Sequence, residues 1–420
     1  MSDASTRQAI EAVFRIERSK LIAGLARMLR DLDAAEELAQ DAFLAAFTDW
    51  PVTGIPDNPG AWLMTTAKRR AIDAIRRRQL HADKEAFLVD EAEQAKPFAS
   101  IEDIEAAMDH DIGDHRLGLI FTACHPVLGA DARAALTLRL LGGLDTGEIG
   151  RAFLTSEATI AQRIVRAKRS IGEAGVAFEV PRGRELAPRL ASVLEVIYLI
   201  FNEGYAATAG DDRMRPALCQ EAQRLGRVLA ARLPDEPEVF GLLALMELQA
   251  SRLVARTAAD GSLLTLAQQN RARWDQLLVH RGLAALNRSE ALGGERGPYA
   301  LQARIAAHHA RAKIYEATDW PGIASTYDTL AEVMPSPVIE LNRAVAHSMA
   351  YGPEAGLRLL DAIAETPALQ TYAPLPAARG DFLFRAGRVL EAKLQFARAA
   401  ELAQNARERE FLRKRSEACG

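Results

Sequence analysis

The chain has 420 residues, of which 49% are hydrophobic and 26% are charged, and its formal net charge is −4. This length and apolar content allow more than one buried core, so we expect a soluble protein of two or three domains. No stretch approaches the roughly 20 uncharged apolar residues that span a bilayer, and the N-terminal segment lacks the apolar core of an export signal; we therefore expect a cytoplasmic protein without a membrane partner.

Helix is the predicted structure for nearly every segment of the chain. Ala, Leu, Arg and Glu dominate, and apolar residues recur at intervals of three and four. The fold class is therefore all-α. A first helical block, residues 8–80, is interrupted at 49–60, where three prolines and two glycines predict a loop.

Two helices of opposite charge flank this loop. Residues 31–47 arrange five carboxylates around an apolar stripe of Leu38, Ala42 and Phe43; the carboxylates are Asp31, Asp33, Glu36, Glu37 and Asp41. Residues 62–78 set six basic residues against a single acid, Asp73; the basic residues are Lys68, Arg69, Arg70, Arg76, Arg77 and Arg78. The acidic face either is solvated or binds a basic partner, and the basic helix lacks the large apolar residues of a membrane-surface helix.

A second helical block follows a linker. Residues 81–113 are acidic and lack a strong apolar stripe, so we predict that they link residues 8–80 to residues 114–177. Within the second block, "DTGEIGRAFLTSEATIAQRIVRAKRS" (145–170) predicts a helix, a tight turn and a longer helix. Asp145 or Thr146 would cap the first helix and Ser156 the second, whose inward stripe is formed by Ile160 and Ile164.

The longer helix of this pair has a one-sided basic cluster. No acidic residue occurs from Ala158 to Gly172, a span that contains Arg163, Arg166, Lys168 and Arg169. A charge run is usually a solvated face, but the caps, the turn and the apolar stripe agree with it in predicting a DNA-binding helix-turn-helix. Basic side chains neutralise phosphates, and the residues expected nearest the base edges are Thr159, Ala161, Gln162, Val165 and Arg166.

The remaining residues, 186–420, carry a weak internal repeat after a junction at 180–186. Its triads are Ile323/Tyr327/Leu330, Ala355/Leu359/Ala362 and Ala392/Phe396/Ala399, which begin 32 and 37 residues apart. These spacings bracket the period of about 34 of tetratricopeptide-type helical hairpins. Stacked hairpins leave a concave surface suited to a protein or peptide partner; an ordinary helical bundle is the alternative.

The sequence contains none of the common motifs of catalysis. It has no Gly-rich phosphate loop, no HExxH, no CxxC and no nucleophile elbow. Cys124, Cys219 and Cys419 lack metal-ligand spacing, and the adjacent His308 and His309 point to different faces of a helix. We therefore predict that the protein is not an enzyme and holds neither a cofactor nor a metal.

Three segments and the acidic linker, taken in order, resemble the extracytoplasmic-function sigma factors of bacterial RNA polymerase, in the sigma-70 family. The segments are "DAAEELAQDAFLAAF" (33–47), "NPGAWLMTTAKRRAIDAIRRR" (58–78) and "LTLRLLGGLDTGEIGRAFLTSEATIAQRIVRAKRSI" (136–171). The resemblance implies a sigma-factor helical domain at 8–80, the linker at 81–113 and a winged-helix-like helix-turn-helix domain at 114–177.

The resemblance also implies roles for individual residues. The acidic helix of the family binds the clamp helices of the polymerase β′ subunit, which here assigns Asp33, Glu36, Glu37, Leu38, Gln40, Asp41 and Phe43. The basic helix captures the minus-ten promoter element, which assigns Trp62, Lys68, Arg69, Arg70, Arg76 and Arg77. The helix-turn-helix, held at the β flap, recognises the minus-thirty-five element through Thr159, Ala161, Gln162, Arg163, Val165, Arg166 and Arg169.

Two of the minus-ten residues, Arg69 and Trp62, leave alternatives open. Many members carry Asn where this chain has Arg69, so the resemblance leaves the captured base open. Trp62 is either a stacking platform for an unpaired base or part of the core, and we favour core packing.

The C-terminal part resembles a subgroup of these sigma factors that has a large tetratricopeptide-like extension. The segments that carry this resemblance are "YLIFNEGY" (198–205) and "ADGSLLTLAQQNRARWD" (259–275). Their polar and amphipathic residues are expected to form a buried network or, alternatively, a ligand or partner site; they are Asn202, Glu203, Arg271, Trp274 and Asp275.

The predicted function is that of a sigma factor that directs promoter-specific initiation by core RNA polymerase on promoter DNA, with residues 186–420 as a fused regulatory or partner-binding module. The alternatives are a helix-turn-helix regulator whose repeat domain senses a ligand or peptide, and a repeat scaffold without promoter activity.

Overall fold

The structure is a computed structural model that describes residues 3–86, 112–153, 155–205, 216–258, 264–403 and 406–419. Within these ranges the secondary structure is helical and no β-strand occurs, which confirms the all-α fold class. Contacts divide the chain into two compact units, Met1–Val228 and Leu229–Gly420, here called the first and second units. None of the described helices combines the length and the apolar composition needed to cross a membrane.

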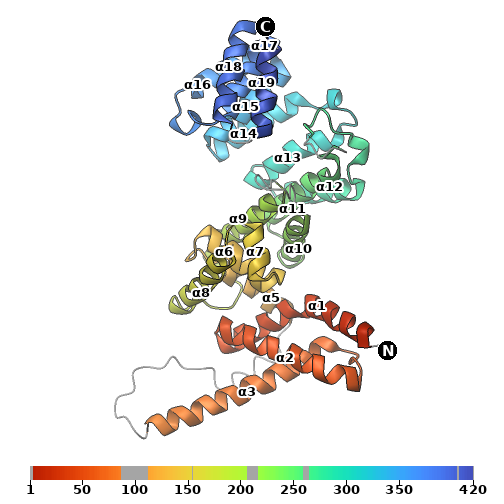
Figure 1. The fold of residues 1–420 in the computed structure, drawn as a ribbon, viewed down its shortest axis with the longest axis vertical. Coiled ribbons are helices and arrows are strands. Elements are labelled where there is room, and N and C mark those ends of the chain that lie inside the picture. Colours follow the sequence, from red (N-terminus) through yellow and green to blue (C-terminus); the bar gives the residue numbers. More distant parts are fainter. Residues whose placement is uncertain are drawn as a thin grey trace. The chain divides into compact units, whose positions relative to one another are not determined.

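Three helices open the first unit, namely α1 (Asp3–Leu29), α2 (Leu32–Thr53) and α3 (Pro59–Ala86), and each packs against the other two (Figure 1, red to orange). The loop predicted at 49–60 is shorter than expected, because α2 continues to Thr53 with Pro51 in its last turn. Trp50 is buried at the start of this turn and packs edge-to-face against Trp62, with ring centroids 5.3 Å apart, which anchors the end of α2 to the core. Most of the predicted linker, residues 87–111, lies outside the described residues.

The helix-turn-helix belongs to a second group of helices in the first unit: α5 (Ile112–Ala123), α6 (Ala130–Thr137), the π-helical turn η2 (Leu138–Gly142), α7 (Thr146–Ala152) and α8 (Glu157–Glu173). The helices α9 (Leu186–Tyr205) and α10 (Pro216–Arg232) follow them.

Helices α9 and α10 contact the helix-turn-helix group through hydrogen bonds and an ion pair, although both helices fall in the predicted extension. Arg133 of α6 is only 8% exposed; it donates to Ser192 and pairs with Glu195 of α9 at 3.0 Å. Arg224 of α10 donates to the carbonyl of Leu141 at 3.0 Å. The contacts therefore place the division between the compact units after Val228 and not at the predicted junction at 180–186.

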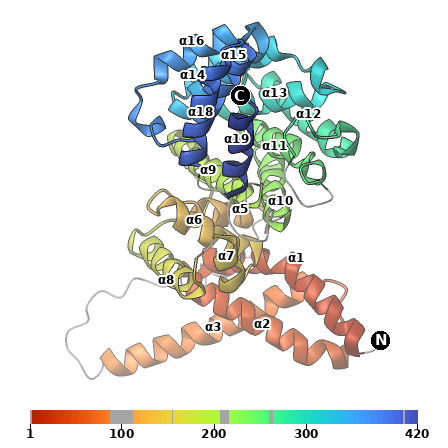
Figure 2. The same ribbon diagram turned by 45° about the horizontal axis from the view of Figure 1, so that its top comes forward.

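The second unit is a succession of helices, most of which pack against their neighbours in sequence (Figures 1 and 2, green to blue). Several begin with proline at the first or second helical position, where its missing N–H costs nothing. The α-helices described in the second unit are α11 (Pro237–Ala250), α12 (Gln276–Ala291), α13 (Pro298–Arg311), α14 (Trp320–Val333), α15 (Pro337–Tyr351), α16 (Pro353–Ile363), α17 (Pro374–Arg385), α18 (Val389–Leu402) and α19 (Ala406–Glu417).

The predicted repeat falls on α14, α16 and α18, but its register in α16 is wrong by one residue. Ala392, Phe396 and Ala399 of α18 are buried as expected, whereas in α16 the buried residues are Gly356, Leu357 and Leu360. A Cβ on Gly356 would lie 2.9 Å from the Ala344 carbonyl oxygen of α15, so the close approach of the two helices requires glycine there. The apolar pattern favoured Ala355 because glycine, which has no side chain, does not register as a core residue.

Candidate nucleic-acid and polymerase interface

Local hydrogen bonds fix both helices of the helix-turn-helix, as predicted. Asp145 and Glu148 form a reciprocal capping box at the start of α7, with N···O distances of 2.6 and 2.9 Å. Ser156 accepts from the Thr159 amide at 3.1 Å at the start of α8. Between them a Cβ on Gly150 would lie 2.9 Å from the Thr155 carbonyl oxygen. The turn is therefore tight because residue 150 is glycine.

Helix α8 has one buried and one exposed face. Ile160, Ile164, Ala167 and Ile171 are buried, which confirms the predicted inward stripe. On the exposed face Val165 is 64% exposed, although a large apolar side chain gains nothing from solvent. An apolar group at this position suits contact with a thymine methyl in the major groove.

The other predicted base and phosphate residues surround Val165. Thr159, Gln162, Arg166 and Arg169 are exposed, and Ala161 and Arg163 are half-buried. Arg163 lies 3.4 Å from Asp131 and Arg169 lies 2.7 Å from Glu173, each in an ion pair with a largely exposed carboxylate. Such pairs contribute about 0–1 kcal/mol, so both guanidinium groups remain available to phosphates.

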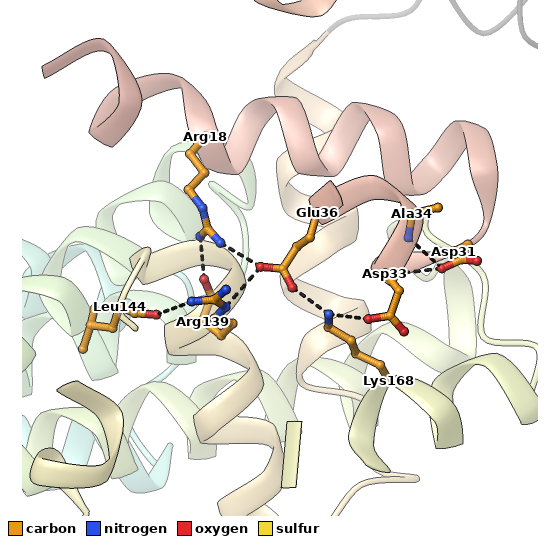
Figure 3. A network of polar contacts seen from close by, with 8 residues as sticks. All are labelled: Arg18, Asp31, Asp33, Ala34, Glu36, Arg139, Leu144 and Lys168. Carbon is orange, nitrogen blue, oxygen red and sulfur yellow. Dashed lines mark hydrogen bonds and ion pairs between the residues drawn. The ribbon is translucent and has the colours of Figure 1, made fainter. Parts of the chain in front are cut away.

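Lys168 is placed differently from the rest of its predicted cluster. Its Nζ lies 2.6 Å from Glu36 Oε2 and 2.7 Å from Asp33 Oδ1 of α2, and its side chain is 9% exposed (Figure 3). Burial opposes the charge of Lys168, but Glu36 and Asp33 together outweigh burial and raise the pKa of the ammonium group. The prediction that Lys168 belongs to the phosphate-binding cluster is wrong for this conformation, because Lys168 flanks the buried stripe and its charge is used within the chain.

Glu36 is the centre of this contact. Besides Lys168 it faces Arg18 Nη2 at 2.7 Å and Arg139 Nε at 3.2 Å, and its own side chain is 13% exposed. Arg18 also donates to the Arg139 carbonyl at 2.6 Å. Burial lowers the pKa of the Arg18 guanidinium, against the opposing effect of Glu36. We call Arg18, Asp33, Glu36, Arg139 and Lys168 the Glu36 cluster (Figure 3).

Nothing in the sequence pointed to Arg18 and Arg139 as functional residues. Lys168 and Asp33 are 135 positions apart along the chain, and helical periodicity carries no information over that separation. Composition indicated which surfaces are charged but not which charged side chains meet.

The predicted polymerase-binding residues of α2 divide by exposure. Asp33, Glu37 and Gln40 are exposed, and Asp41 is half-buried beside Arg70, at 3.4 Å. Leu38 and Phe43 are 9% and 3% exposed, so a partner cannot reach them in this fold and their assignment as contact residues needs correction. They belong to the apolar stripe that packs α2 onto its neighbours, and Phe43 lies edge-to-face with Phe14 at 4.7 Å.

Leu44 and Phe47 of α2, which are 56% and 42% exposed, are absent from the predicted set. They follow Glu37 and Gln40 at helical spacings of seven, so the four residues share one face of α2. This spacing could have identified them, but on α2 the apolar stripe of Leu38, Ala42 and Phe43 was the only apolar face considered.

The basic helix α3 presents part of its predicted set. Trp62 is half-buried against Trp50, in agreement with core packing. Arg69 is exposed, while Lys68 and Arg70 are half-buried, and burial lowers the pKa of Lys68. Arg76 and Arg77 lie on the α3 backbone, but their side chains fall outside the described residues.

The five extension residues separate between the two compact units. In the first, Asn202 of α9 hydrogen-bonds Tyr198 of the same helix, and Glu203 is half-buried. In the second, Arg271 and Trp274 form a buried cluster in which the guanidinium lies 5.4 Å from the centroid of the indole ring. Asp275 is exposed and accepts from the Leu278 amide at 3.0 Å, which caps α12. Arg271 and Trp274 are therefore buried against each other, while the network of all five residues stays a prediction.

Comparisons with known proteins agree with this arrangement. Residues 13–81 match the family model described as Sigma-70 region 2, residues 119–171 match Sigma-70, region 4, and residues 189–290 match a family of unknown function (DUF6596). The last match spans the division after Val228. No solved structure matches the chain.

Three related proteins align with different shares of this chain. An uncharacterized protein, R00370, of Rhizobium meliloti (strain 1021) is 42% identical over 399 residues, which are 94% of this chain and 92% of the relative. The ECF RNA polymerase sigma factor SigK of Mycobacterium ulcerans (strain Agy99) is 30% identical over 154 residues, 35% of this chain and 75% of SigK. A probable ECF RNA polymerase sigma factor, SigI, of Mycobacterium tuberculosis (strain ATCC 25618 / H37Rv) is 24% identical over 244 residues, 54% of this chain and 82% of SigI.

Proposed function

The chain belongs to the extracytoplasmic-function sigma factors of the sigma-70 family, and from this premise we propose how its parts divide the work of promoter recognition. A sigma factor binds core RNA polymerase and promoter DNA and directs initiation, while the polymerase makes the bonds. We assign the exposed face of α2 to the clamp helices of the β′ subunit, α3 to the minus-ten element, and α8, held at the β flap, to the minus-thirty-five element. The protein would act in the cytoplasm, where its polymerase is.

One observation carries the assignment of α8. Its apolar stripe is buried while Gln162, Val165 and Arg166 are exposed on the opposite face, and both helices of the motif have side-chain caps. A helix held in this way presents a rigid face to a groove, so that base contacts need no local folding.

Arg166→Ala is expected to lower run-off transcription from the cognate promoter about tenfold, because a good arginine contact to a base or phosphate contributes roughly 1–3 kcal/mol. The assay uses core polymerase, with templates enriched by genomic selection. Arg184→Ala is the matched control, since Arg184 is exposed but lies outside the helix-turn-helix; it should stay within about twofold of the unmodified protein.

The same assay separates the alternatives. A conventional helix-turn-helix regulator would bind closed duplex DNA without polymerase and give no promoter-dependent product. A repeat scaffold would leave promoter output unchanged when Arg163 and Arg166 are both neutralised. Failure to obtain promoter-dependent transcription from any enriched site would overturn the proposed function.

We further propose that the second unit acts as a regulatory or partner-binding module in cis. Its large helical surface supports this role, and the helices from α11 to α19 lie in a compact unit of their own. Deletion of residues 229–420 is expected to change transcription at least severalfold, measured in the run-off assay and with a promoter reporter in cells. The cut follows Val228, which keeps Glu195 beside Arg133. Wild-type output from this truncated protein in both assays would contradict the proposal.

A further inference from the structure

We propose that the free protein is closed on itself through the Glu36 cluster, in which Lys168 and Arg139 of the helix-turn-helix group occupy the carboxylates that α2 would offer to polymerase. This inference rests on the proposed function, since it takes Asp33 and Glu36 as polymerase contacts. It makes the DNA-binding group an internal competitor of polymerase.

The geometry engages both carboxylates, and it encloses Glu36 while Asp33 stays exposed. Glu36 is contacted by three cations within 3.2 Å, two of which come from the helix-turn-helix group. Asp33 shares Lys168 with Glu36, at 2.7 Å. In Figure 3 the Glu36 side chain extends between the two arginines on one side and Lys168 on the other. A basic partner surface cannot reach Glu36 until Lys168 and Arg139 withdraw.

The contact is stronger than an ordinary surface ion pair and yet can open. Lys168 and Glu36 are 9% and 13% exposed, so water and salt screen their attraction less than at an open surface. On opening, Glu36 keeps Arg18, which lies on α1 beside α2. Because Glu36 is never left as a buried charge without a partner, the open form avoids the large penalty of an orphaned ion.

The consequence is mutual exclusion between the closed form and the polymerase complex. Any partner that binds Asp33 and Glu36 shifts the equilibrium toward the open form by its differential affinity for the two forms. Polymerase binding would then free the group that carries α8, so that minus-thirty-five recognition follows holoenzyme formation. The free factor would correspondingly have little affinity for promoter DNA.

A zero-length cross-link tests the closed form with groups that the protein already has. A water-soluble carbodiimide activates a carboxylate; an adjacent lysine amine then attacks it, forming an amide and releasing the reagent as its urea. We expect peptides joining Lys168 to Glu36 or Asp33 in the full-length free protein, identified by mass spectrometry. Equimolar core polymerase added first should reduce their yield at least fivefold.

The isolated cross-linked monomer should bind core polymerase at least tenfold more weakly than untreated protein. Lys168→Arg is the matched control, because it keeps the positive charge but lacks an amine that the reagent can couple. The treated Lys168→Arg protein should bind polymerase normally, which accounts for carboxylates modified elsewhere.

Arg139→Gln provides an independent measurement, since Arg139 is placed in neither the polymerase-binding nor the DNA-binding set. Loss of its ion pair with Glu36 weakens the closed form only, so affinity for core polymerase should rise about threefold. Arg184→Gln, at an exposed site, should leave the affinity unchanged.

Each outcome decides between the two proposals. Absence of cross-links at Lys168 in the free protein, or normal polymerase binding by the cross-linked monomer, would overturn the closed form. An unaltered affinity of Arg139→Gln would also contradict it. If untreated protein fails to bind polymerase at all, the proposed function falls, while the cross-link still reports whether the chain closes.

Discussion

Arg271→Met is expected to lower the free energy of unfolding of the second unit by roughly 3 kcal/mol. Arg271 is 7% exposed and donates to the carbonyls of His309 and Ala312 and to the Thr318 hydroxyl, at 2.8, 2.9 and 3.0 Å. Methionine fills much of the same space but leaves these three acceptors without the donor that the guanidinium supplied. Denaturant unfolding followed by circular dichroism measures the loss.

Arg273→Met is the control for this substitution. Arg273 is two residues away but exposed, so its replacement should change the unfolding free energy by no more than about 0.5 kcal/mol. A loss below about 1 kcal/mol for Arg271→Met would show that the three acceptors find other donors and that Arg271 is not the centre of the local structure.

Acidification from about pH 7 to about pH 4 is expected to destabilise the second unit by about 3 kcal/mol through His309 alone. Burial, with help from Arg252 and Arg271, lowers the pKa of His309 to about 4. Above about pH 6.5 the imidazole is neutral in both the folded and the unfolded chain, so it has no effect. As the pH falls below that value, His309 becomes protonated in the unfolded chain but stays neutral in the folded protein. The unfolded state is thereby favoured, and stability is lost.

The measurement is the difference in unfolding free energy between the unmodified protein and His309→Phe, followed across this pH range. Phenylalanine keeps a ring against Trp320, which His309 meets edge-to-face at 5.3 Å, but it cannot titrate. The variant should therefore lose less stability in acid. His280→Gln removes an exposed imidazole from the same unit and serves as control. Parallel pH curves for the unmodified protein and His309→Phe would contradict the assignment.

The features that were predicted correctly from the sequence depend on neighbouring residues. Asp145 and Ser156 cap their helices through amides three positions away. The stripe of Ile160 and Ile164 follows from helical periodicity. These local rules were enough to place the helix-turn-helix and to identify its exposed face.

The sequence predictions that were wrong are those in which tertiary packing overrides a local preference. Helix α2 passes Pro51 because burial of Trp50 outweighs the proline's lost hydrogen bond. Leu38 and Phe43 were assigned to the polymerase contact, but both side chains are buried in the core. The pairing of Lys168 with Glu36 depends on how two separate helical groups meet, which no pattern within either group encodes.

The position of α9 and α10 has a practical consequence for chimeric proteins. A recombinant exchange of C-terminal modules between two such factors that joins them at residue 181 would separate Arg133 from Ser192 and Glu195, and Arg224 from the Leu141 carbonyl. The helices of the other factor that replace α9 and α10 would then have to make these contacts with a helix-turn-helix group that is not their own. Crossing over after Val228 leaves these three contacts intact, so the family match that begins at residue 189 is not the best guide to where the chain can be cut.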